Sequence, residues 1–179
     1  MANKFKPKLI IVLTLIMIAS AGVLTFVQQL TLPKIESHAQ QKKENAILTV
    51  LPGAEEYEQV DKGDLTLYKG LDSSGNVVGY ALQNSGQGFQ SVLKIMVGLD
   101  VDAKKVMKVK ILNQAETPGL GARITEKQFK SQFNDKAFSD SFQAKKDIDA
   151  ISGATISSQA MSDVIKGAIK KIQESDINL

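Results

Sequence analysis

Cysteine and tryptophan are absent from this sequence, and His38 is its only histidine. Without cysteine the chain has no disulfide, no thiolate nucleophile, no cysteine-ligated iron–sulfur cluster and no thioether-attached haem. With one histidine, which we interpret as a surface residue, it cannot build a site from several imidazoles. We therefore expect no metal site, and any redox chemistry would have to come from an organic cofactor.

Acidic residues are missing from the first 27 positions, where Lys4, Lys6 and Lys8 account for the whole net charge of +3. Residues 28–179 are therefore formally neutral. A nucleic-acid-binding protein needs a basic patch on its folded part. The charge balance gives no reason to expect such a patch, and we expect no nucleic-acid partner.

Charge of either sign is absent from Leu9 to Val27, a run of apolar residues. As a helix this run spans roughly 28 Å at about 1.5 Å per residue, and lysines before a span favour a cytoplasmic N-terminus. The sequence predicts a single-pass protein of the cell membrane, with a cytoplasmic stub and transmembrane anchor at 1–28 and an extracytoplasmic domain at 29–179. A cleaved signal peptide is the alternative, because Ala19-Ser20-Ala21 resembles a cleavage site, but the apolar run continues well beyond it.

The soluble part predicts an α+β fold, a small antiparallel sheet with packed helices, after the one N-terminal transmembrane helix. A helix is expected from Pro33 to Leu51, ended by Pro52-Gly53. The β pattern runs from Leu65 to Leu112, with a hairpin turn at 72–76. A short helix is expected at 126–133 and a long helix at 157–174. The long helix carries one apolar stripe: Met161, Val164, Ile165, Ala168, Ile169 and Ile172.

Small residues precede the long helix in the segment Asp149-Ala150-Ile151-Ser152-Gly153-Ala154-Thr155. A helix N-terminus presents free N–H groups and the positive end of the helix dipole, which favour phosphate. Thr155 offers a hydroxyl at that place. The alternative is that Thr155 only caps the helix, as it could in a flavin-free extracytoplasmic binding or scaffold protein.

A second motif, Glu116-Thr117-Pro118-Gly119-Leu120-Gly121, follows the last predicted strand. Proline followed by glycine indicates a type II turn, with Gly119 at the position that needs positive φ. Taken alone, this motif is typical of a tight turn that leaves a sheet. The segment 86–89 before the central strand is interpreted as a loop.

Together these motifs resemble the covalent FMN-binding domain family, in which a flavin transferase takes FAD and esterifies FMN to the threonine that closes the motif, here Thr155. Over its full length the chain is similar to the G subunit of Rnf-type ion-translocating electron-transport complexes. The single N-terminal span, the segment 96–100, the motif 116–121 and the final Ser-Gly-Ala-Thr helix match in order. The related C subunit of sodium-pumping NADH:quinone reductase, normally longer, is the nearer alternative. The chain departs from relatives at 86–91, where a Gly-Tyr-Gly-Gly-like run is common, and no flavin contact is assigned to Phe89.

The resemblance implies a redox subunit of a ferredoxin:NAD⁺ oxidoreductase coupled to Na⁺ or H⁺ transport, not catalytic alone and without catalytic residues of its own. Its partners would be other membrane subunits of the complex and the flavin transferase. Thr155 would be an anchor for FMN, and Asp149 would serve recognition by the transferase or order the loop. The residues implied to bind the cofactor are Thr155, Ser152, Gly153, Ala154, Asp149, Glu116, Thr117, Gly119 and Leu120.

Overall fold

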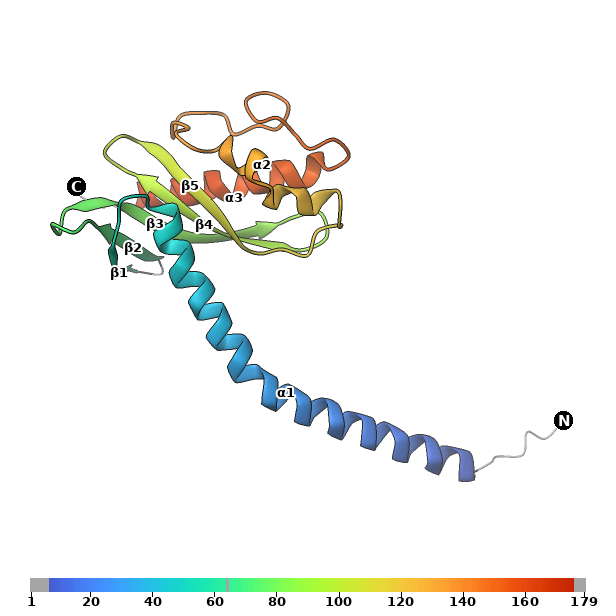
Figure 1. Cartoon of the computed structure of the whole chain (residues 1–179). Helices are drawn as coiled ribbons and strands as arrows, with labels where there is room; N and C mark the ends of the chain where they lie inside the picture. Colours follow the sequence, from blue (N-terminus) through green and yellow to red (C-terminus); the bar gives the residue numbers. More distant parts are fainter. Residues whose placement is uncertain (1–6, 64, 176–179) are drawn as a thin grey trace. The chain divides into compact units, whose positions relative to one another are not determined.

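The structure is a computed structural model that describes residues 7–63 and 65–175 (Figure 1). It divides into a helical part that ends at Gln41 and a compact unit that begins at Lys42. The elements are α1 (Pro7–Val50), β1 (Glu56–Lys62), β2 (Leu65–Leu71), β3 (Val77–Gln87), β4 (Val92–Asp100), β5 (Lys105–Asn113), η1 (Gly121–Thr125), α2 (Lys127–Ser131) and α3 (Thr155–Glu174). The α+β prediction is confirmed.

Helix α1 is continuous from Pro7 to Val50, with Pro33 inside it. The prediction that a separate helix begins at Pro33 is therefore wrong. Proline removes one backbone hydrogen bond, the one that the carbonyl of Gln29 would otherwise accept. No glycine lies between Gly22 and Gly53 to end the helix earlier. Among the described residues, α1 is the one helix long and apolar enough to cross a membrane.

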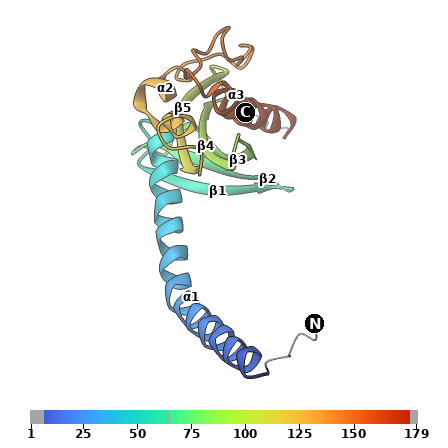
Figure 2. The ribbon, with the colours of Figure 1, turned by 90° about the vertical axis from the view of Figure 1, so that its right-hand side faces the viewer.

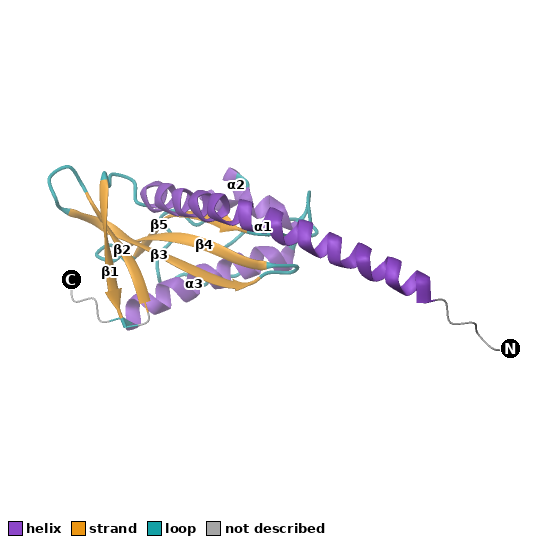
Figure 3. Cartoon of the chain, turned by 90° about the horizontal axis from the view of Figure 1, so that it is seen from below, coloured by secondary structure: helices purple, strands orange, loops and turns teal. Residues whose placement is uncertain are grey.

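The five strands form one antiparallel sheet in the order β1-β2-β3-β4-β5 (Figure 3). The predicted hairpin between β2 and β3 is confirmed: the Asp72 carboxylate accepts the amides of Ser74 and Asn76, both at 2.8 Å. Strand β1 was not predicted. Its sequence, Glu-Tyr-Glu-Gln-Val-Asp-Lys, is largely exposed and offers no run of alternating apolar residues.

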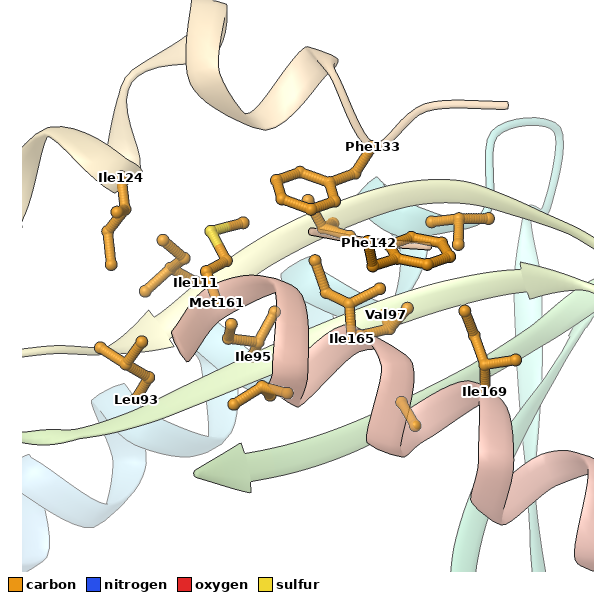
Figure 4. Close-up of a cluster of buried hydrophobic side chains, with 14 of the residues drawn as sticks. Leu93, Ile95, Val97, Ile111, Ile124, Phe133, Phe142, Met161, Ile165 and Ile169 are labelled. Carbon is orange, nitrogen blue, oxygen red and sulfur yellow. The ribbon is translucent and has the colours of Figure 1, made fainter. Parts of the chain in front are cut away.

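The two faces of the sheet carry separate cores within the compact unit. Helix α3 lies across one face, in contact with β3 and β4 (Figure 2). The six predicted stripe residues of α3 are buried there, several of them against β4 and β5 (Figure 4). The last turns of α1, with Ala46, Ile47 and Val50 buried, belong to the core of the opposite face. The sheet is thus fixed on both sides, and the N-terminus of α3 is held beside the loops that leave the sheet.

Candidate functional site

The two motifs singled out in the sequence lie against each other in the structure. A Cβ on Gly153 would come within 3.1 Å of Leu120 Cδ2, and a Cβ on Gly121 within 2.7 Å of Ser157 Oγ. A Cβ on Gly121 would also lie 2.9 Å from Glu116 Cβ, so a larger residue there would push the segments apart. At Gly153 the exposed Leu120 side chain could move aside, and the φ of +78° is what favours glycine. The long-range contact joins the turn after β5 to the start of α3.

Glu116 is the polar centre of this contact and is only 4% exposed. Its carboxylate accepts the backbone amides of Phe89, Gln90 and Ser91 at 3.0–3.2 Å. The Ser157 hydroxyl donates to the same carboxylate at 2.5 Å. A Cβ on Gly88 would lie 2.5 Å from Glu116 Oε1. One carboxylate therefore holds together the loop between β3 and β4, the motif 116–121 and the first turn of α3.

Burial alone would raise the pKa of Glu116, because a charged carboxylate is poorly solvated inside a protein. The hydrogen bonds from Ser157, Gln90 and Ser91 outweigh burial and hold the pKa below its usual value of 4.5. Glu116 is ionised at neutral pH, and its negative charge is satisfied by protein donors. Its role in the site is to position the surrounding segments.

The turn that follows Glu116 has the predicted form. The Leu120 amide donates to the Thr117 carbonyl at 3.2 Å, and Gly119 has φ +73°. Apart from its two chain neighbours, no described residue has a heavy atom within 4 Å of a Cβ built on Gly119. A side chain at this position would therefore meet open space, and backbone strain alone would oppose it.

Gly119→Val should lower the free energy of unfolding by about 1–3 kcal/mol, because a β-branched residue is forced into the left-handed region. Gly119→Asn is the matched control, since asparagine enters this region more readily and fits the same open space. Urea denaturation measures both. Equal stability of the valine variant and the wild type would contradict a strained turn.

A cavity of about 310 Å³ opens where the motifs meet, lined by Phe89, Thr117, Leu120, Gly121, Gly153, Ala154, Thr155, Ile156 and Ser157. We call it the apolar cavity. Three large apolar side chains on its wall are exposed: Phe89 by 61%, Leu120 by 44% and Ile156 by 60%. Exposed apolar groups around one hollow are typical of a ligand site or an interface.

Thr155 is half-buried at the start of α3. Ala154 is the N-cap of α3 and makes no side-chain cap hydrogen bond, and Thr155 is the first helical residue. The interpretation of Thr155 as the helix cap is therefore wrong. Within residues 7–63 and 65–175, no group hydrogen-bonds the Thr155 side chain. The loop before it is held by Ser158 instead, which accepts the Ile151 amide at 3.1 Å and donates to the Ala154 carbonyl at 2.9 Å.

A second cavity of about 350 Å³ also borders Thr155 and is lined by Lys145, Lys146, Asp149, Ala150, Ile151, Ser152, Gly153 and Thr155. We call it the polar cavity. The main chain of Asp149 is clamped by the Gln132 amide, which donates to the Asp149 carbonyl and accepts the Asp149 N–H at 2.7 Å. The backbone at Asp149 is thus held in place while the Asp149 side chain stays exposed.

The predicted site residues fall into three groups. Thr117, Leu120, Gly153, Ala154 and Thr155 line the apolar cavity, and Asp149 and Ser152 line the polar one. Glu116 lies buried beneath the site, and Gly119 belongs to the turn without lining either cavity.

Four further residues complete the apolar cavity and were not among the predicted site residues: Phe89, Gly121, Ile156 and Ser157. Ile156 had a signal in the sequence, because this apolar residue lies off the buried stripe of its helix. The signal for Phe89 was weaker. It follows Gly86 and Gly88, which favour a close approach of the backbone to another group, but the neighbouring residues do not show which segment this loop contacts.

The sequence model of the FMN-binding domain family matches residues 88–170, a range that contains both motifs. The G subunit of an ion-translocating oxidoreductase complex from Methanosarcina acetivorans is 33% identical over 97% of this chain and 98% of its own length. The chain belongs to the family of these G subunits.

Two further G subunits are similar over most of their length. That of a proton-translocating ferredoxin:NAD⁺ oxidoreductase complex from Clostridium ljungdahlii is 26% identical, covering 89% of this chain and 88% of the relative. That of a Na⁺-translocating ferredoxin:NAD⁺ oxidoreductase complex from Acetobacterium woodii is 27% identical, covering 93% and 91%.

A solved structure shares the fold of this G-subunit family member. The C subunit of Na⁺-translocating NADH-quinone reductase from Parabacteroides distasonis superimposes with a TM-score of 0.62 over 83% of this chain and 98% of that one, at 17% identity.

Proposed function

We propose that this chain is the FMN-carrying electron-transfer subunit of a membrane-bound, ion-translocating oxidoreductase complex, with FMN esterified through its phosphate to Thr155. The observation that carries the proposal is the Thr155 hydroxyl. It has no partner among the described residues and lies where an apolar and a polar cavity meet. The similarity to G subunits of ferredoxin:NAD⁺ oxidoreductases supports ferredoxin and NAD⁺ as the terminal partners of the complex.

The residues around Thr155 fit FMN in both size and chemistry. The apolar cavity has the dimensions of a small-molecule site, and Leu120, Ile156 and Phe89 offer surface against which an isoalloxazine ring packs. The first amides of α3 have no intrahelical partner and favour a phosphate at the same end. Bound FMN would supply one- and two-electron chemistry, while the chain supplies position and electrostatics.

The attachment reaction is a phosphoryl transfer from FAD to Thr155, catalysed by a flavin transferase. Thr155 Oγ1 forms a bond to the FMN phosphorus as the bond from that phosphorus to the AMP oxygen breaks. AMP leaves with the electron pair of the broken bond, and the hydroxyl proton passes to the transferase or to water. The ester holds the redox-inert end of the cofactor, and Thr155 acts as an anchor.

The chief rival is a flavin-free extracytoplasmic binding or scaffold protein. The main argument for this alternative was that Thr155 caps α3. The N-cap of α3 is Ala154, and no side chain makes a capping hydrogen bond, so the structure removes that argument. An extracytoplasmic location of the compact unit is also part of our proposal, because Lys4, Lys6 and Lys8 precede the apolar run.

Orientation has a direct test. A protease added to intact cells or spheroplasts should degrade the chain beyond residue 28, because the compact unit faces outward. Inverted vesicles should protect it, and a cytoplasmic protein probed in the same samples reports leakage. Digestion of the compact unit only in inverted vesicles would show that the orientation is the opposite of the one proposed.

Flavin binding is tested on the full-length protein, coexpressed with or without a flavin transferase. After denaturing electrophoresis, the band from the coexpressed sample should fluoresce under ultraviolet light, since a phosphoester survives denaturation. A band that stays dark although the transferase is active on another substrate would remove the proposed function.

A further inference from the structure

Thr155 and Gly153 line both cavities, so the two hollows adjoin at the proposed attachment point. The two hollows differ in chemistry. The apolar cavity presents Leu120 and Ile156, whereas the polar cavity presents Lys145 and Lys146. FMN has a comparable division, because the faces of its isoalloxazine ring pack against apolar groups whereas its phosphate is an anion. A flavin fixed at Thr155 can therefore place each end against matching chemistry.

The charge of the polar cavity is positive on balance. Lys145 and Lys146 are both exposed, and neither forms an ion pair within the described part of the chain. Among the described residues, the carboxylate of Asp149 is the one acidic group on the wall. Two unpaired ammonium groups attract a pyrophosphate, which carries more than one negative charge, and outweigh the single repulsive carboxylate.

The loop that carries these lysines is held firmly by Asp147. Its carboxylate accepts the Ser141 hydroxyl at 2.7 Å and the amides of Phe142 at 2.9 Å and Gln143 at 2.6 Å. Lys136 adds an ion pair to the same carboxylate at 3.4 Å.

Two further hydrogen bonds fix the loop next to the lysines. The Ala144 amide donates to Gln159 Oε1 of α3 at 2.8 Å, which ties the loop to the helix that begins at Thr155. Lys145 has φ +67°, and its amide donates to the Ile148 carbonyl at 2.8 Å. The backbone that presents both lysines is therefore fixed relative to the Thr155 hydroxyl.

We propose that Lys145 and Lys146 form the phosphate side of the flavin site. They draw the pyrophosphate of FAD toward Thr155 during attachment, and afterwards they face the free oxygens of the phosphoester. This role rests on the proposed attachment at Thr155. It also gives the bound cofactor a direction, with the phosphate toward Lys145 and Lys146 and the ring toward Leu120 and Ile156.

The first test measures the initial rate of covalent flavin attachment to the full-length, detergent-solubilised protein, with purified transferase and FAD. K145Q/K146Q should lower this rate about tenfold at low salt and flatten its salt dependence. K94Q/K108Q is the matched control, because it removes the same charge from exposed lysines of β4 and β5. Its rate should equal that of the wild type. Equal rates in all three proteins, or equal slowing of both variants, would overturn the proposal.

The second test does not depend on attachment. Flavin-free, full-length protein is titrated with inorganic pyrophosphate while the amide resonances of Ser152 and Gly153 are followed by NMR. The wild type and T155V should both show saturable shifts, and K145Q/K146Q should lose them. Absence of these shifts in the wild type would overturn the phosphate site. If the shifts are present and no flavin is ever attached, the proposed function fails and the anion site stands.

Discussion

Thr155→Val should abolish covalent flavinylation while leaving the fold intact. Valine keeps the branched shape of threonine and removes the oxygen that would bond to phosphorus. The Thr155 hydroxyl makes no hydrogen bond to the described residues, so its loss should change the free energy of unfolding by less than about 0.5 kcal/mol. In-gel fluorescence and circular dichroism of the coexpressed protein measure the two properties. A valine variant that still fluoresces after denaturation would exclude Thr155 as the attachment residue.

Two variants sharpen this result. Thr155→Ser restores a hydroxyl at the same place and should recover flavin at least in part. Ser152→Ala removes an exposed hydroxyl three positions earlier and should remain flavinylated. Ser157 and Ser158 are unsuitable as controls, because both are buried and hydrogen-bonded to Glu116 and to the attachment loop respectively.

Glu116→Gln should lower the free energy of unfolding by about 3 kcal/mol. Its carboxylate accepts three backbone amides and the Ser157 hydroxyl, and hydrogen bonds to a charged acceptor contribute about 1.5–3 kcal/mol each. A glutamine amide turns a donor toward groups that need an acceptor. Urea denaturation measures the loss. Flavin attachment should also slow, since the first turn of α3 loses its support.

Glu126→Gln is the control from the same region. Glu126 forms an exposed ion pair with Arg123 at 3.1 Å, a type of pair that contributes about 0–1 kcal/mol. Equal destabilisation by the two substitutions would show that Glu116 has no special structural role.

The effect of Glu116 should also depend on pH. Because its folded pKa lies below the usual value of 4.5, its stabilising contribution is complete above that value and is lost as the pH falls through the folded pKa. The stability difference between the wild type and Glu116→Gln should therefore narrow below about pH 4.5. A difference that stays constant down to acid pH would contradict an ionised, hydrogen-bonded carboxylate.

Local patterns predicted the elements whose signal lies within a few residues. The Asp72 hairpin, the apolar stripe of α3 and the positive φ of Gly119 each follow from nearest-neighbour chemistry. Strand β1 was missed because it gains its order by pairing with β2 and buries none of its own residues fully. The prediction that a helix begins at Pro33 failed because proline removes only one backbone hydrogen bond. This loss does not end a helix when the residues on both sides favour helical structure.

The sequence predicted only those residues of the site that lie within a recognisable motif. The segment 149–155 and the motif 116–121 were both found in the sequence, and both line or support the cavities. The contacts of Glu116 join residues 25 to 41 positions apart, and no local rule predicts such partners. In the sequence, Lys145 and Lys146 look like ordinary surface lysines. Only the fold shows that they line a cavity together with Thr155.

Mass spectrometry of the attachment peptide tests the central claim most directly. Trypsin cleavage after Lys146 and Lys166 releases a peptide that contains Thr155 together with several serines. From protein coexpressed with a flavin transferase, the account predicts a peptide mass increased by FMN minus one water, with fragment ions that assign the addition to Thr155. An unmodified Thr155 in protein whose flavin is carried on another residue, or is lost on denaturation, would contradict the account.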